Sequence, residues 1–309
     1  MNYGWLEEKT PVLFFRLRRI KRFFFEKKMK SLSSNDIKVL DAQLYEHYIG
    51  KKLDWNNLQS YTEKMQWYKI CDSNERKSLM TDKYRVRAIV GDIIGEQYLI
   101  PLLGCYKRAS RIDFSMLPNK FVLKVNSGSG DTIIVRDKEA LTRKDMRRIR
   151  AQLDYYLHCD FSWNAYELHY SDIQPVIIAE ELIECDQEDL PDYKFLCFNG
   201  KPYYCWVDTG RYHDHKRNVY DLEWNLQEWN QSSFGNTEME LEKPQCFNEM
   251  VGIAEKLSKG FSHVRVDLYN VKGRIYFGEM TFSNGRGFDP IIPEDANAML
   301  GAMWDTSVN

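Results

Sequence analysis

The sequence predicts an α+β protein in which a mostly helical N-terminal part precedes a mixed body with antiparallel strands. Three observations lead to this class. Residues 36–95 are helical in character, with individual helices expected over 61–70 and 82–95. Two later segments, 194–207 and 263–281, alternate as strands do and turn on Asn-Gly and Lys-Gly, so they are read as hairpins. Between these parts, two β-rich runs flank a glycine-rich loop.

The other elements follow in order along the chain. Residues 11–30 repeat apolar side chains at helical spacing from Pro11 onward, and the polar residues 31–37 end that helix. Further strands are expected at 98–106, 121–125, 132–135 and 176–183, and further helices at 138–158 and 247–260. These elements suggest four regions: a basic amphipathic N-terminal helix (1–35), a mostly helical region (36–118), a region with the glycine-rich loop (119–183) and a region with the two hairpins (184–309).

Composition excludes several classes of protein. The 309 residues carry a formal net charge of −2, which argues against a general nucleic-acid binder. Seven cysteines, an odd number without a CxxC pair, indicate a reducing compartment rather than a disulfide framework. No apolar run is long enough for a transmembrane helix, and no secretory signal is evident. We therefore expect a cytoplasmic protein that has no nucleic-acid partner.

The first 30 residues differ from the rest in charge. They hold nine Lys or Arg against three Glu, and five Phe are interleaved with the basic residues of 11–30. A basic, aromatic, amphipathic helix is typical of a segment that lies in the plane of an anionic membrane. We therefore expect peripheral membrane contact through residues 1–30. Two alternatives are a helix that packs on the body with a solvated basic face, and a nucleic-acid-binding arm.

The glycine-rich loop spans residues 127–132. Glycine lets backbone N–H groups approach and cradle phosphate oxygens, and Lys124 lies three residues before the loop. A P-loop has its Lys directly after the glycines, and a protein kinase has an HRD loop that is absent here. The segment is thus a phosphate-binding loop of another kind, or a plain tight hairpin.

The last hairpin carries two carboxylates. Period two puts Arg265 and Asp267 on one sheet face and Glu279 on the face of Phe277. With a loop at 271–273, we expect Arg265 opposite Glu279 and Asp267 diagonal to it. Hard oxygen ligands of this kind hold Mg²⁺ between protein and phosphates. The alternative is an exposed sheet face with an Arg–Glu cross-strand pair.

Six strings follow one another along the chain: YTEKMQWYK (61–69), DKYRVR (82–87), FVLKVNSGSG (121–130), LPDYKFLCFNGKP (190–202), HKRNVYDLEWN (215–225) and VRVDLYNVKGRIYFGEMTFSNGRGF (264–288). They contain, in order, Lys83, Lys124, the glycine-rich loop, Lys216, Arg265 with Asp267, and Glu279, and 180–183 lies between the third and fourth strings. This order resembles that of ATP-grasp enzymes, and the strings themselves are similar to the TupA-like ATP-grasp branch of polysaccharide gene clusters. The resemblance covers about residues 50–290 and implies the ATP-grasp fold, in which two α+β lobes, here 119–183 and 184–309, clasp ATP.

The resemblance implies a nucleotide contact for each matching residue. The contacts are Lys83, Lys124, Ser127, Gly128, Ser129, Gly130, Glu180, Glu181, Ile183, Asp192 and Lys194. The two Lys that precede the loop would hold phosphates from the two lobes, and the loop would close over the β- and γ-phosphates. Glu180 and Ile183 would bound the adenine at the hinge between the lobes. Asp192 would contact the ribose, and Lys194 beside it points to phosphate or substrate.

The same resemblance implies the catalytic and metal residues. Lys216 would touch the γ-phosphate, with Arg217 as the alternative, and Arg265 would stabilise charge on the reacting carbonyl. The implied magnesium ligands are Asp267, Glu279 and Thr281, with Asn284 as the alternative to Thr281. The backbone amides of 284–287 would complete an oxyanion site.

The implied activity is that of an ATP-dependent carboxylate–amine ligase that uses ATP and Mg²⁺ and passes through an acyl phosphate. Its expected partners are a carboxylate acceptor on a glycan or glycolipid, such as a uronic acid of a surface polysaccharide, and an amino-acid amine donor. Two alternatives stay open: an ATP-dependent sugar kinase, and a non-catalytic nucleotide-binding protein of a glycan pathway.

Overall fold

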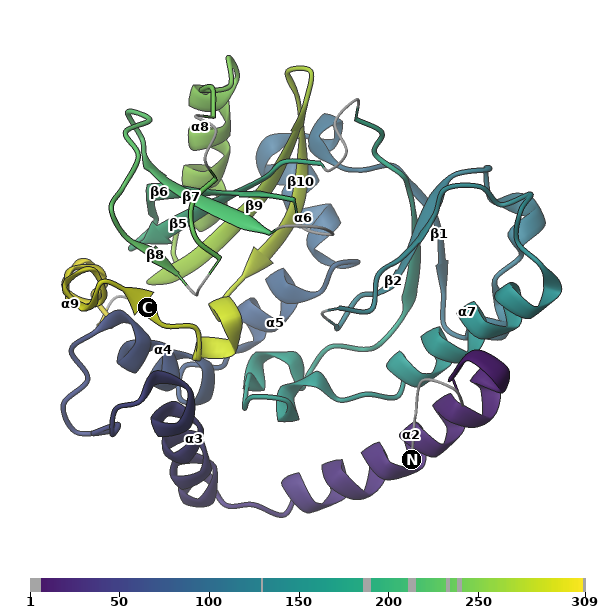
Figure 1. Ribbon diagram of the computed structural model, residues 1–309, viewed down its shortest axis with the longest axis horizontal. Coiled ribbons are helices and arrows are strands. Elements are labelled where there is room, and N and C mark those ends of the chain that lie inside the picture. Colours follow the sequence, from purple (N-terminus) through teal and green to yellow (C-terminus); the bar gives the residue numbers. More distant parts are fainter. Residues whose placement is uncertain are drawn as a thin grey trace.

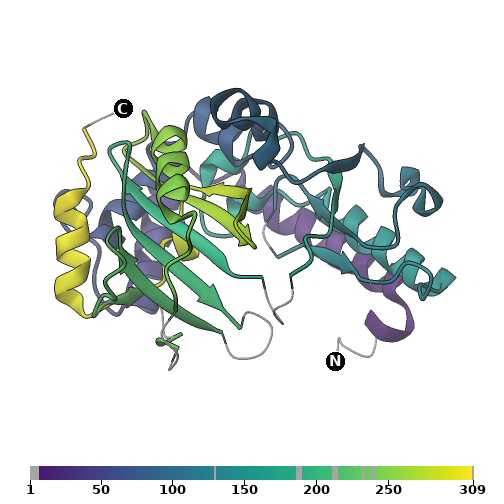
Figure 2. The same cartoon turned by 90° about the horizontal axis from the view of Figure 1, so that it is seen from above.

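The computed structural model describes residues 7–128, 130–185, 190–210, 215–231, 234–237 and 241–307. They form two lobes, each built on an antiparallel sheet, and the lobes face one another across the middle of the molecule (Figure 1). The helices between residues 11 and 70 run along the base of both lobes in Figure 1, and the first of them lies against the smaller lobe in both views (Figures 1 and 2).

The N-terminal part is helical, as the sequence predicts. Its helices are α2 (Pro11–Met29), α3 (Ser34–Ile49), α4 (Tyr61–Ile70), α5 (Glu75–Thr81) and α6 (Val86–Ile94). The last of these begins four residues later than predicted. Asp82 ends α5 with an extended backbone, and its carboxylate accepts hydrogen bonds from the amides of Tyr84 and Arg85. Lys83 therefore lies on a turn rather than inside a helix.

The smaller lobe contains a four-stranded sheet in the order β1-β4-β2-β3. These strands are β1 (Leu102–Tyr106), β2 (Phe121–Val125), β3 (Ile133–Val135) and β4 (Ile177–Glu181). Phe121, Leu123 and Val125 are fully buried in a core shared with α7 (Arg143–Tyr156), so strand alternation turns Lys124 to the opposite face. α7 begins later than the predicted 138 because Thr142 and Asp145 form a capping box.

The larger lobe contains a five-stranded antiparallel sheet in the order β10-β9-β5-β6-β7. Its strands are β5 (Asp192–Phe198), β6 (Lys201–Thr209), β7 (Lys216–Asp221), β9 (His263–Val271) and β10 (Arg274–Thr281). One face packs on α8 (Phe247–Ser258) and forms the main hydrophobic core. Both predicted hairpins are confirmed. Their turns, Asn199-Gly200 and Lys272-Gly273, have positive φ at both residues, as a two-residue turn requires.

The predicted register of the last hairpin is wrong. Glu279 pairs with Asp267, and Thr281 pairs with Arg265. The turn consists of Lys272 and Gly273 alone, because Val271 pairs with Arg274, and the register shifts by one more residue between Phe277 and Glu279. Gly278 is the extra residue of this β-bulge, and a Cβ there would lie 3.0 Å from the carbonyl oxygen of Asp267. Glu279 consequently leaves the core face of Phe277 and joins Arg265 and Asp267 on the other face of the sheet.

The C-terminal helix α9 (Glu294–Met303) packs on α4. Lys64 on α4 donates hydrogen bonds of 2.8 Å to the carbonyls of Gly301 and Trp304, which end α9. Gly301 lies so close to the start of α4 that a Cβ there would be 2.2 Å from the carbonyl oxygen of Gln59 and 2.7 Å from Ser60 Cα. The close contact of these two helices therefore requires glycine at 301.

Two helix-interior glycines make a matched test of this contact. We expect Gly301→Ala to lower the free energy of unfolding by about 1–3 kcal/mol, because backbone atoms must move to accept the methyl group. Gly252 in α8 has no atom within 4 Å of its Cβ position, so Gly252→Ala should be neutral or stabilise by up to about 1 kcal/mol. Urea unfolding of both variants measures this, and equal effects would contradict the role of Gly301.

Candidate active site

The site is built on the face of the five-stranded sheet that points away from α8. Strand pairing brings charged residues from four neighbouring strands to this face, since Lys194 pairs with Asp267, Asp192 with Asp208, and Asp208 with Arg217. The face carries Asp192, Lys194, Trp206, Asp208, Arg217, Arg265, Asp267 and Glu279. We call this set the charged face.

Arg265 and Asp267 form the centre of the charged face. The Nε and Nη2 atoms of Arg265 donate to the two carboxylate oxygens of Asp267 at 2.6 and 2.5 Å. Lys194 approaches the same carboxylate at 3.0 Å and also pairs with Asp192. The side chains of Lys194, Asp192 and Asp267 are at most 3% exposed, so these charges neutralise one another away from water. Lys194 therefore points at carboxylates in this structure, and its predicted phosphate or substrate contact stays a prediction.

A second ion pair extends the charged face toward β7. Arg217 donates to both oxygens of Asp208, at 2.6 and 2.9 Å, and its guanidinium carbon lies 4.9 Å from the centre of the Trp206 ring. Burial alone would raise the pKa of Asp208, but hydrogen bonds from Arg217 and His215 hold it well below its usual range. Strand alternation puts Arg217, and not its neighbour Lys216, on the charged face.

Glu279 is the most accessible carboxylate of the set, with 38% of its side chain exposed. Its Oε1 accepts a hydrogen bond from the Thr281 hydroxyl at 3.1 Å and lies 3.6 Å from Arg265. Burial raises the pKa of Glu279, but the positive charges of Lys83, Arg265 and Lys194 outweigh this and lower it to about 2. The Thr281 hydroxyl also accepts from Arg265 at 3.1 Å, so it orients both side chains.

Lys83 joins the two lobes. Its ammonium donates to the carbonyl of Gly128 in the glycine-rich loop at 2.7 Å and lies 3.5 Å from Oε2 of Glu279 on the larger lobe. Its backbone amide donates to the carbonyl of Asn126, whose side chain bonds Asp82 and the backbone at 174 and 176. Lys83 is thus fixed where the loop and the charged face meet.

A carboxylate within the glycine-rich loop, that of Asp131, holds the two ends of the loop together. Asp131, which is almost fully buried, accepts a hydrogen bond of 2.5 Å from the amide of Val125. Gly130 has φ +77°, a conformation that favours glycine. Ser127 is 3% exposed, and its hydroxyl has no hydrogen-bond partner in the part of the chain that the structure describes. Ser129 lies outside the described residues.

Lys124 and Glu180 lie on the face of the smaller sheet that is turned away from α7. Lys124 pairs with Glu180 at 2.6 Å, and Arg87 on α6 pairs with the other oxygen of Glu180 at 2.9 Å. Glu181 ends β4, and Ile183 lies in the connection from β4 to β5 in the other sheet. The adenine contacts predicted for Glu180 and Ile183 and the nucleotide contact predicted for Glu181 stay predictions.

Side chains of α4 donate hydrogen bonds to the backbone of the loop 284–287, which follows β10. Gln66 donates to the carbonyl of Gly287 at 2.6 Å, and Lys69 donates to the carbonyl of Arg286 at 3.1 Å. Asn284 is 1% exposed and donates to the hydroxyl of Tyr61, while its own Oδ1 has no partner within the described residues. The strings 61–69 and 264–288, far apart in sequence, thus meet in one substructure.

The comparison with protein families decides the family of the chain. The profile of the family described as TupA-like ATPgrasp matches residues 63–305. The chain belongs to this family. The match includes both sheets, the glycine-rich loop and the charged face, so the two lobes constitute an ATP-grasp fold preceded by a helical N-terminal region.

Several solved ATP-grasp structures are similar to this chain. One is a D-alanine–D-alanine ligase from Bacillus anthracis, with a TM-score of 0.43 and 14% identity over 72% of this chain and 62% of that one. Another is the ATP-grasp ligase PsnB in complex with a phosphomimetic variant of a minimal precursor, Mg and ADP. Its TM-score is 0.40, and the identity is 14% over 74% of this chain and 60% of that one. The chain thus spans about three fifths of the length of each. No curated protein gave a match.

The donor set fits ATP and Mg²⁺ together. Lys83 and Lys124 supply cations for phosphate oxygens, and the Ser127 hydroxyl, which has no partner among the residues that the structure describes, supplies a polar group. Among the described residues, no group of three or more His, Cys, Asp or Glu side chains is arranged to hold a metal ion by itself. Mg²⁺ usually binds through one or two carboxylates plus substrate phosphates, and Glu279 suits that role. Both oxygens of Asp267 accept hydrogen bonds from Arg265, and Oδ2 also accepts one from Lys194, so a metal ion at Asp267 would compete with these cations.

Sequence reasoning missed three residues of the site. Asp208 could not be placed from the turn of the first hairpin alone. A two-residue turn at 199–200 without a bulge would pair Asp192 with Val207. A register shift within the hairpin pairs Asp192 with Asp208 instead. Arg87 lay within the matched string DKYRVR but had no assigned partner. Trp206 could have been found from strand alternation, because residues 206 and 208 of one strand lie on the same face of the sheet.

The lowered pKa of Glu279 predicts a pH dependence of stability. A depressed carboxylate pKa stabilises the folded state above the unfolded pKa, near 4.5, and this stabilisation is lost as pH falls toward 2. Glu279→Gln should therefore flatten the dependence of the unfolding free energy on pH between 4.5 and about 2.5. Denaturant titrations at several pH values measure it, with the exposed Glu255→Gln as control. Parallel curves for wild type and Glu279→Gln would contradict the assignment.

Proposed function

We propose that this protein is an ATP-dependent carboxylate–amine ligase. One observation carries the proposal: Lys83 contacts both the glycine-rich loop and Glu279, so the groups suited to phosphates and the groups suited to Mg²⁺ converge at one point between the lobes. Membership of the TupA-like ATPgrasp family supports a nucleotide in that position.

The reaction would run in two steps. A carboxylate oxygen of the acceptor attacks the γ-phosphorus of ATP, which forms an acyl phosphate and releases ADP. The amine of the donor then attacks the acyl carbon, the C–O bond to phosphate breaks, and an amide and inorganic phosphate result. Bound Mg²⁺ supplies neutralisation of phosphate charge at the β- and γ-positions.

The chain's own residues would hold and neutralise the reacting groups. Lys83 and Lys124 reach the phosphate end of the site from the turn before α6 and from β2. Arg265, a permanent cation fixed by Asp267 and Thr281, stabilises negative charge that develops on oxygen in either step. One such preorganised donor typically contributes about 2.7–4 kcal/mol to lowering a barrier. Asp267 and Glu279 would hold the metal.

The substrate assignment follows the family resemblance. The acceptor would be the carboxylate of a uronic acid on a glycan or glycolipid, and the donor an amino acid, in the biosynthesis of a surface polysaccharide in the cytoplasm.

Nucleotide binding gives the first test. Lys124→Ala should weaken Mg-ATP binding at least roughly tenfold, because a charge-assisted contact to phosphate is lost. Lys120→Ala is the matched control, because Lys120 precedes β2 by one residue and is 47% exposed, away from the Lys124 ion pair. Titration calorimetry measures both. Equal ATP affinities for the two variants would contradict the proposed site.

The products of the reaction give the second test. We expect ADP and phosphate, without AMP, when the enzyme meets uronic acids and amino acids in a screen. Hydroxylamine in place of the amine should trap a hydroxamate of the acceptor. Arg265→Lys should lower turnover by roughly 100-fold with little change in ATP affinity. Sugar phosphate without hydroxamate would instead identify a kinase, and pyrophosphate release would contradict the ATP-grasp chemistry.

A further inference from the structure

Helix α2 has two different faces. Phe14 and Phe15 are buried against Tyr155 of α7 and its neighbours. The only carboxylate of α2, Glu26, is also buried, where it pairs with Arg22 and accepts a hydrogen bond from the amide of Asp160. These buried contacts fix α2 to the smaller lobe. Because Glu26 takes part in them, no acidic side chain of α2 remains on its outward face.

The outward face of α2 is apolar. Seventeen large hydrophobic side chains are exposed among the described residues, and seven of them lie on this helix. They are Val12, Leu13, Leu17, Ile20, Phe23, Phe24 and Phe25, each at least 40% exposed. Four of the seven, at 13, 17, 20 and 24, follow the helical spacing of a single face, which we call the apolar stripe. An exposed patch of this kind marks an interaction surface.

Basic residues border the apolar stripe on both sides. Successive residues of an α-helix are about 100° apart, which places Lys21 and Lys28 on one flank of the stripe and Arg16 and Lys27 on the other. All four are exposed. An apolar centre with cationic flanks matches the interface of an anionic bilayer, where acyl chains lie below phosphate groups.

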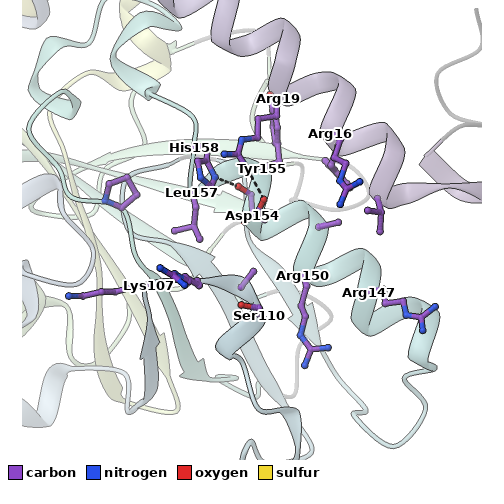
Figure 3. Close-up of a pocket in the computed structure, with 16 residues that line it drawn as sticks. Arg16, Arg19, Lys107, Ser110, Arg147, Arg150, Asp154, Tyr155, Leu157 and His158 are labelled. Carbon is purple, nitrogen blue, oxygen red and sulfur yellow. Dashed lines mark hydrogen bonds and ion pairs between the residues drawn. The ribbon is translucent and has the colours of Figure 1, made fainter.

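A basic cavity of about 620 Å³ opens beside the Arg16 flank of the stripe. It lies between α2, α7 and the segment 107–110, and Figure 3 shows Arg16 and Arg19 on α2 above Arg147 and Arg150 on α7. Its charged lining consists of Arg16, Arg19, Lys107, Arg108, Arg147, Arg150 and a single carboxylate, Asp154. That carboxylate pairs with Arg19 at 3.1 Å.

The cavity therefore has a surplus of positive charge. Within the described ranges, no carboxylate forms an ion pair with Arg16, Lys107, Arg108 or Arg147. Arg150 is held in place by the carbonyl of Ile112 at 2.9 Å. Such a group of cations around a concave site suits a phosphate monoester or diester, because Arg and Lys form charge-assisted hydrogen bonds with phosphate oxygens.

We propose that α2 and this cavity form a docking surface for an anionic phospholipid bilayer. The apolar stripe would lie among the acyl chains at the interface, and the cavity would hold a lipid phosphate at its edge. No described helix is both long enough and apolar enough to cross a membrane, so contact would be in the membrane plane. A second copy of the chain would bring like charges together, and a nucleic acid would leave the apolar stripe exposed to water.

Vesicle binding by the full-length protein tests this surface. The protein is sedimented with phosphatidylcholine vesicles and with phosphatidylcholine–phosphatidylglycerol vesicles at low and physiological salt, without nucleotide. We expect binding only to the anionic vesicles, weaker at higher salt. The cavity variant Lys107→Gln/Arg108→Gln/Arg147→Gln should bind roughly 100-fold less, since each basic residue near such a surface contributes about 1 kcal/mol. The stripe variant Leu17→Ser/Phe24→Ser should bind the anionic vesicles at least roughly tenfold more weakly, because it loses exposed apolar surface.

Two controls separate docking from folding and from simple charge. Lys201→Gln/Lys256→Gln/Arg274→Gln removes three exposed cations from the larger lobe and should bind as wild type does. Circular dichroism and thermal unfolding verify that both test variants fold, and each changes only exposed positions. Equal binding to neutral vesicles, or wild-type binding by the cavity variant, would overturn the proposal. So would a wild-type dimer in analytical ultracentrifugation that the stripe variant converts to monomer.

Discussion

Arg265 and Asp267 share one strand and form two parallel hydrogen bonds on a sheet face from which water is largely excluded. A buried ion pair costs desolvation energy unless its remaining polar groups are also satisfied, and removal of one partner leaves a charge without compensation. Oppositely charged neighbours on adjacent strands satisfy the polar groups around this pair. They are Lys194, Asp192, Asp208 and Arg217. The charged face is therefore stable only as a set, and the pairing of all its strands must be maintained.

Two β-bulges maintain that set. In each hairpin a tight two-residue turn fixes one register near the turn, and a register shift farther along changes which side chains share a face. The shift in the first hairpin brings Asp208 opposite Asp192, and the shift at Gly278 brings Glu279 opposite Asp267. Since α8 covers the opposite face with an apolar core, a carboxylate left on that side would be buried without a partner. The bulges thus separate an apolar face from a charged one within the same strands.

The N-terminal helices support the site from outside the two sheets. Lys69 on α4 is fully buried, pairs with Asp41 of α3 at 2.7 Å and holds the carbonyl of Arg286. Burial raises the pKa of Asp41 to about 6, against the opposing effect of Lys69. The loop at 284–287, with positive φ at its middle residues, is therefore supported by α3 and α4. In this chain the helical string 61–69 and the hairpin string 264–288 are therefore parts of one substructure.

The amino-acid sequence by itself determined the order and type of most elements. Period-two alternation and the Asn-Gly and Lys-Gly turns act locally, so both hairpins and most of the other strands and helices could be predicted within a few residues, whereas β7 and α9 were not predicted. The sequence also named Lys83, Lys124, Asp267 and Glu279, because their motifs occur as ordered strings. Tertiary structure alone decided which of these meet: the bulge at Gly278, the contact of Lys83 with both lobes, and the choice of Phe14 and Phe15 rather than the apolar stripe as the buried face of α2. Alternation and helical spacing show that a face is apolar, but which face is covered depends on elements that lie far away in the chain.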